Sequence, residues 1–107
     1  MANCVPELLD DLAKVFATVR TWEGVIERKP GVFYVRNQPF LHFHLLAGNR
    51  RRADVKGCTH WVEIDLPRPA PARKRRTLLR ELTQAYAEKV ATGRARRRRP
   101  TEDPHHG

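Results

Sequence analysis

The apolar residues of this 107-residue chain follow two periods, and the change between them limits the folds open to it. In residues 5–20 and 72–91, apolar side chains recur every three to four positions, which is typical of amphipathic helices. From residue 22 to residue 66 the period is two, in short runs separated by Gly, Pro and Asn. Such runs indicate antiparallel strands joined by tight turns. The order helix, three to five strands, helix predicts an α+β two-layer sandwich with both helices on one face of the sheet.

The alternation also assigns the two faces of the predicted sheet, whose strands we expect at 25–28, 32–36, 40–47, 51–56 and 60–66. We expect the helices to cover the apolar face and to leave the other face open. The apolar face would carry Phe33, Val35, Leu41, Phe43, Leu45, Ala53, Val55, Val62, Ile64 and Leu66. The open face would carry Tyr34, Arg36, His42, His44, Arg52, Asp54, Lys56, Trp61, Glu63 and Asp65.

The charge of the chain lies entirely in its second half. Residues 1–48 hold five basic and five acidic side chains, so the formal +9 belongs to residues 49–107. After Gly93, a plausible end for the second helix, the only apolar residue is Ala95. Such a segment cannot bury enough surface to offset the entropy of ordering. The sequence therefore predicts one domain, residues 1–93, followed by a disordered basic tail, residues 94–107.

Three basic clusters make nucleic acid the expected partner. Guanidinium and ammonium groups neutralise phosphates and release counterions, which gives affinity without sequence reading. A phosphate would also relieve the repulsion among cations at the start of the second helix. The alternative is a set of solvated faces and a solubilising tail. The cluster residues are Arg50, Arg51 and Arg52; Arg73, Lys74, Arg75 and Arg76; and Arg96, Arg97, Arg98 and Arg99.

The open face offers two further candidates. Tyr34 and Trp61, with Arg36 nearby, could stack nucleic-acid bases, or a dimer partner or the tail could cover them. His42 and His44 lie two apart on one strand, so both point the same way and could bind a metal. Neighbouring Asp54, Glu63 or Asp65 would complete that site. The alternative is a polar face in which the two histidines pair with carboxylates or stack on Tyr34.

Enzyme signatures are mostly absent. The chain has no serine, no glycine-rich phosphate loop and no paired-cysteine zinc motif, so we predict a non-enzyme without a cofactor. No apolar run approaches the roughly 18–20 residues of a membrane span, and no secretory leader is recognisable. We therefore expect a cytoplasmic protein with reduced cysteines. Its partners would be nucleic acid or a second copy of the chain; a ligand module or a protein-interaction subunit is the alternative.

Several segments together resemble a known family. They are G-V-F-Y-V-R-N-Q-P-F at 31–40, H-W-V-E-I-D-L at 60–66 and L-L-R-E-L-T-Q-A-Y-A-E-K-V at 78–90. In this order, after a leading helix, they are similar to the small bacterial MmcQ/YjbR-like proteins, whereas residues 40–44 are more similar to other small bacterial proteins. The resemblance implies a compact α+β fold like that of frataxin and a DNA-binding role. It transfers no catalytic residue.

Overall fold

The sheet has the predicted antiparallel order. In this computed structural model the backbone is described for residues 2–3 and 6–102, and the side chains for 6–48 and 50–92. Five strands follow one another in space as they do in sequence, and a short strand β1 (Ala2–Asn3) pairs with the end of β4. The five are β2 (Val25–Lys29), β3 (Val32–Val35), β4 (Gln38–Leu45), β5 (Arg51–Lys56) and β6 (Trp61–Leu66).

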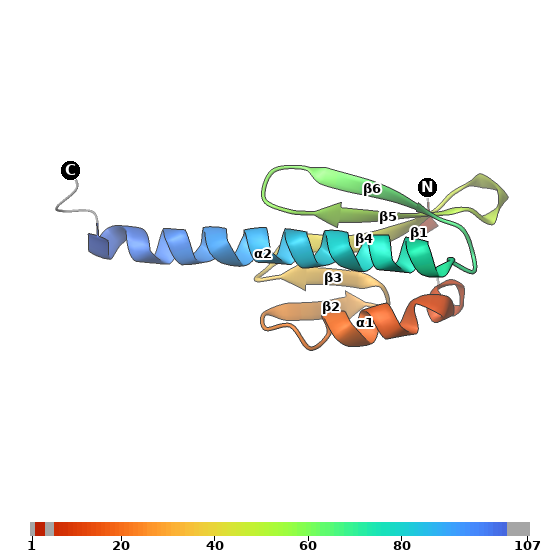
Figure 1. The fold of residues 1–107 in the computed structure, drawn as a ribbon, viewed down its shortest axis with the longest axis horizontal. Coiled ribbons are helices and arrows are strands. Elements are labelled where there is room, and N and C mark those ends of the chain that lie inside the picture. The colour runs from red at the N-terminus through yellow and green to blue at the C-terminus, as the bar shows by residue number, and fades with distance from the viewer. Residues whose placement is uncertain (1, 4–5, 103–107) are drawn as a thin grey trace.

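Two helical segments cover one face of this sheet, as Figure 1 shows. The first consists of η1 (Pro6–Leu12), a 3-10 helix, and α1 (Ala13–Val19); the second is α2 (Ala72–Glu102). A short 3-10 turn, η2 (Ala47–Asn49), joins β4 to β5. The predicted α+β sandwich is confirmed. Its core is the apolar sheet face packed under the two helices, with Leu12, Phe33, Leu41, Leu78 and Leu82 fully buried.

The turn between β3 and β4 lies one residue earlier than the sequence predicts. Arg36 and Asn37 both have positive φ, 52° and 69°, as a two-residue hairpin turn requires. Arg36 therefore belongs to the turn and not to the open face of a strand, which corrects its predicted place. Gln38 and Pro39 start β4 instead, and an irregularity beside Pro39 lets Phe40 join Leu41 in the core.

Both helical segments differ in detail from the prediction. The first begins as a 3-10 helix, and the Leu8 carbonyl within it accepts a hydrogen bond from the Arg51 side chain. The second does not end near residue 91 but continues through Gly93 to Glu102. Ala and Arg favour helix, and extending an existing helix avoids the cost of nucleation.

The backbone of residues 94–102 continues α2, and the boundary at residue 93 with a disordered tail beyond it stays a prediction. The rest of the predicted tail, residues 103–107, lies outside the described part. No helix among the described residues is long and apolar enough to cross a membrane.

Candidate functional site

The first basic cluster, residues 50–52, does not form one surface. Arg51 faces the core, and its side chain is fully buried. Its guanidinium donates to both carboxylate oxygens of Asp11, at 2.7 and 2.9 Å. It also donates to the main-chain carbonyls of Leu8, Leu66 and Pro67. Arg51 therefore ties the first helix to the end of β6 and cannot touch a polyanion, which corrects its predicted role.

Arg50 and Arg52 remain accessible, but they share their surroundings with carboxylates. Arg52 donates to both oxygens of Asp54, at 2.8 and 3.1 Å, and its Nη1 lies 3.7 Å from Glu63. A shallow hollow of about 620 Å³ beside β5 and β6 contains Arg50 and Arg52 together with Glu63 and Asp65. Phosphate would meet negative charge here, so this region is a weak candidate for binding it.

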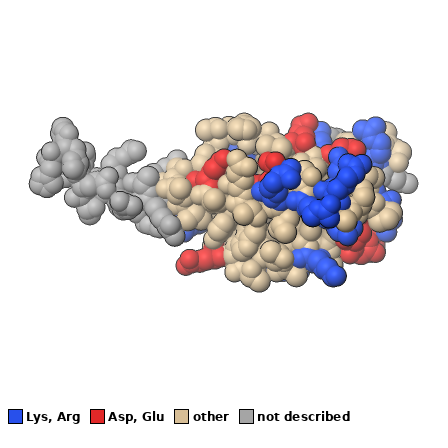
Figure 2. Space-filling view, in the orientation of Figure 1, with Lys and Arg blue, Asp and Glu red and all other residues tan. Residues whose placement is uncertain are grey.

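The second basic cluster lies in the first turns of α2 and has no acidic partner among the side chains that the structure describes. Arg73, Lys74, Arg75 and Arg76 follow Pro71, whose carbonyl accepts the main-chain N–H of Lys74 and of Arg75. The first turn of α2 has no acidic residue. Within the described part of the chain, none of the four takes part in a salt bridge. Figure 2 shows positive side chains gathered over the end of the molecule where α2 begins.

A hollow between α1 and α2 brings a further lysine to this cluster. It has a volume of about 250 Å³ and is lined by three cations, Lys14, Arg75 and Arg76, without a carboxylate. The other lining side chains are apolar or uncharged. Sequence reasoning missed Lys14 because it lies in the neutral half of the chain. Lys14 precedes the buried Val15 and Phe16, so it lies at the edge of the apolar stripe of this helix. That position was the only indication in the sequence that Lys14 could lie beside a packed element.

The aromatic candidates on the open face do not form one stacking platform. Tyr34 lies on β3 and Trp61 on β6, with two strands between them. Each ring already has a cation over it: the Arg28 guanidinium carbon is 4.3 Å from the Tyr34 centroid, and Lys56 Nζ is 5.4 Å from that of Trp61. Stacking of bases on Tyr34 and on Trp61 stays a prediction, and each ring would have to act separately.

The two predicted histidines meet a carboxylate at the centre of the open face. His44 Nε2 is 3.1 Å and His42 Nε2 is 4.0 Å from Oδ2 of Asp54, which stands opposite His42 on β5. Burial lowers the pKa of His42 below its ordinary value, and the neighbouring His44 and Arg52 lower it further. The Asp54 carboxylate acts in the opposite direction but does not outweigh them. The other candidates for this site, Glu63 and Asp65, are not part of the group.

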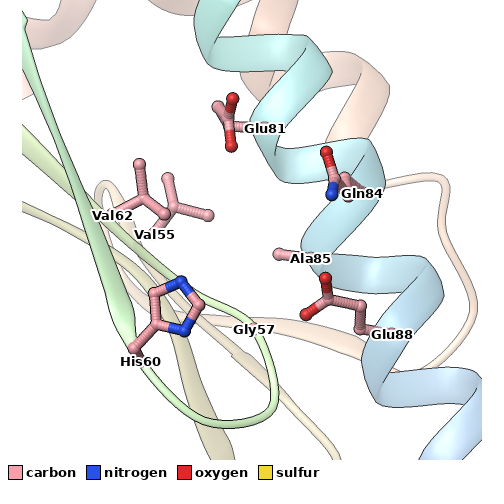
Figure 3. A pocket seen from close by; sticks show the side chains of 8 residues that line it. All are labelled: Val55, Gly57, His60, Val62, Glu81, Gln84, Ala85 and Glu88. Carbon is pink, nitrogen blue, oxygen red and sulfur yellow. The ribbon is translucent and has the colours of Figure 1, made fainter.

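A smaller hollow, of about 120 Å³, lies where α2 crosses the hairpin between β5 and β6 (Figure 3). Val55, Val62 and Ala85 form its apolar part. Glu81 and Glu88 reach into it from α2, and His60 stands on the hairpin side. Glu88 also accepts the main-chain N–H of Cys58 at 3.4 Å. Its negative lining makes it unsuitable for phosphate.

The candidate residues of the predicted tail are placed by their backbone alone. The side chains of Arg96, Arg97, Arg98 and Arg99 lie outside the described part, although their backbone continues α2.

No protein family, curated protein or solved structure was found to match this chain. The resemblance to MmcQ/YjbR-like proteins therefore stays a prediction.

Proposed function

We propose that this protein binds nucleic acid without sequence preference, through phosphate contacts made by α2 and by Lys14. The observation that carries the proposal is the charge of one element. Ala72–Glu102 holds eleven Lys and Arg against three Glu, so α2 accounts for +8 of the formal +9 of the chain. A helix with that charge attracts a polyanion over a long range and neutralises several phosphates after contact.

The start of α2 supports the proposal in a second way. The positive end of a helix macrodipole is an unfavourable place for cations, and four of them lie there in succession. A phosphate in the hollow lined by Lys14, Arg75 and Arg76 would offset both the dipole and the mutual repulsion. Contacts of this kind go to the backbone of the nucleic acid and carry no sequence information.

The length of α2 supports contact with more than one phosphate. Its 31 residues form a rod of roughly 46 Å at about 1.5 Å per residue. Figure 1 shows that the rod continues well past the edge of the sheet. One turn of duplex DNA measures about 34–36 Å along its axis, so α2 is longer than the axial rise of one turn.

The test is a titration of labelled duplex and single-stranded DNA and RNA at several salt concentrations. We expect binding whose logarithmic affinity falls linearly with the logarithm of salt, by about 0.9 per duplex phosphate neutralised. Replacing Arg96, Arg97, Arg98 and Arg99 by Gln should weaken binding and flatten the slope while keeping the length of the chain. An absence of binding to every polynucleotide in dilute buffer would disprove the proposal.

A further inference from the structure

We propose that His42, His44 and Asp54 form a binding site for a divalent transition-metal ion, with Zn²⁺ as the best match. This site lies on the open sheet face, away from the helices, and the inference does not rest on nucleic-acid binding. The three side chains offer two imidazole nitrogens and one carboxylate oxygen, all within 4.8 Å of one another. Imidazole favours zinc and its neighbours in the transition series over magnesium or calcium.

The spacing of the donor atoms is close to that of a zinc site. Tetrahedral Zn²⁺ with bonds of about 2.0–2.1 Å requires ligand atoms about 3.3 Å apart. His44 Nε2 is 3.1 Å from Asp54 Oδ2, and His42 Nε2 is 4.0 Å from the same atom. His44 and Asp54 are thus already at the spacing of two ligands, and His42 has to move toward them before all three surround one ion.

The sheet itself fixes the three residues. His42 and His44 share one face of β4 because their positions differ by two, and antiparallel pairing sets Asp54 directly opposite His42. The two imidazole rings pack edge to face with centroids 4.6 Å apart. Two central strands of a sheet move less than loops do, so the site is largely formed before a metal arrives.

Arg52 positions the carboxylate. The Asp54 side chain is only 9 % exposed, and Arg52 Nε donates to its Oδ1 at 2.8 Å. That bond can persist while Oδ2 binds the ion, and metal-ligating carboxylates are ordinarily held by such outer hydrogen bonds. The second donor of Arg52, Nη2, is 3.1 Å from Oδ2 and must give way. The positive charge of Arg52 repels the ion, whereas its hydrogen bond to Oδ1 holds the carboxylate in place, so the two effects of Arg52 on metal affinity have opposite signs.

Three protein ligands leave one coordination position of a tetrahedral ion free. The helices cover the other face of the sheet (Figure 1), so the site lies on the face that they leave open. Trp61 borders it, with its ring centroid 4.8 Å from that of His42. A water molecule or a small anion can complete the coordination, and Trp61 provides a signal for metal binding.

The experiment uses the full chain with His105→Ala and His106→Ala, which removes the two imidazoles near the C-terminus. Zn²⁺ is titrated by calorimetry, and Ni²⁺ by the quenching of tryptophan fluorescence. We expect one ion per chain. His42→Gln or His44→Gln should weaken binding by at least about tenfold, since even loss of an outer partner costs about 10–100-fold. The matched control, His60→Gln, removes an exposed imidazole from the other side of the sheet and should leave the affinity unchanged.

Two further measurements separate metal binding from any effect of the substitutions on folding. Zn²⁺ should raise the unfolding temperature of the background protein and not that of Asp54→Asn, a change of nearly equal shape. Trp61→Phe should remove most of the Ni²⁺ quenching while calorimetry still detects the ion. The proposal is overturned if no ion binds, or if the affinity survives the loss of His42 and His44. It is equally overturned if His60→Gln is the variant that abolishes binding.

Discussion

The clusters at residues 50–52 and 73–76 are both runs of basic side chains, yet they have opposite surroundings. On β5 the run is divided by the alternation of the strand, so that Arg51 enters the core while Arg52 faces carboxylates across the sheet. At the start of α2 the four basic side chains are distributed around the helix, and none has an acidic partner among the described residues. A run of like charges thus stays unneutralised, and available to an anion, only where the fold brings no opposite charge to it.

The difference depends on residues that are distant in sequence. Asp11, which neutralises Arg51, precedes it by 40 positions, and Lys14, which adds to the helical cluster, lies in the same first helical segment. Two residues separated by one turn of that segment therefore act in opposite directions. One cancels a buried positive charge, and the other enlarges an exposed positive surface.

The largest effect should follow from breaking the buried ion pair. Asp11→Ala leaves the fully buried Arg51 without its carboxylate, and uncompensated buried charge costs about 3–5 kcal/mol of unfolding free energy. Urea denaturation measures it. The control, Asp10→Ala, removes an exposed carboxylate and should change stability by less than about 0.5 kcal/mol. Equal losses in the two variants would contradict the importance of the pair.

Low pH should remove the same contribution of the Asp11–Arg51 pair to the unfolding free energy. Burial raises the pKa of Asp11, but hydrogen bonds from Arg51 and from the Ala70 N–H outweigh it, so the pKa lies below its ordinary value of 3.8. The folded protein then binds fewer protons than the unfolded chain, and stability from Asp11 is present above the ordinary pKa. It is lost as the pH falls through the lowered value. The stability difference between wild type and Asp11→Ala should therefore shrink below about pH 4.

A smaller loss is expected on the open face. Arg52→Gln removes two hydrogen bonds from the nearly buried Asp54, which retains His44 as a partner. We expect a loss of unfolding free energy that is smaller than for Asp11→Ala, because solvent screens the Arg52 guanidinium. Arg50→Gln, at an exposed position, should cost less than about 0.5 kcal/mol. The comparison fails if Arg50 proves as important to stability as Arg52.

The helical cluster should respond with the opposite sign. Arg73→Gln removes a positive charge from the positive end of the α2 dipole, so we expect the protein to become more stable by about 0.3–1 kcal/mol at low salt. Thermal unfolding in dilute buffer measures the change, and added salt should diminish it. A loss of stability would show that Arg73 has a structural partner.

The fold could be predicted because its signals are local. Alternation placed all five main strands within two or three residues, and the periodic stripe placed both helical segments. The errors in the helical segments were of two kinds. The first segment begins as a 3-10 helix, in which the Leu8 carbonyl accepts a hydrogen bond from Arg51, a residue far away in the sequence. The end of α2 was misplaced because Gly93 lowers helix stability by only about 1 kcal/mol, which neighbouring Ala and Arg can offset.

The candidate sites were predicted to different degrees for the same reason. The shared face of His42 and His44 follows from strand parity, which is readable in the sequence, but the choice of Asp54 over Glu63 and Asp65 needed the register of β4 and β5. The burial of Arg51 could also have been read from parity, since residue 51 shares a face with Ala53 and Val55, but a run of three arginines suggested a surface. Lys14 could not be assigned, because only the packing of α1 beside α2 brings it to Arg75.

The most direct test of the proposed function compares two triple variants in salt-dependent binding to duplex DNA. Lys14→Gln, Arg75→Gln and Arg76→Gln remove the three cations of the α1–α2 hollow, whereas Arg28→Gln, Lys29→Gln and Arg50→Gln remove three exposed cations elsewhere. Both variants lose the same charge. We predict weaker binding for the first variant, with a slope flatter by up to about 2.7, and a much smaller change for the second. Equal effects would mean that net charge alone attracts the polyanion, and would contradict a binding surface at the start of α2.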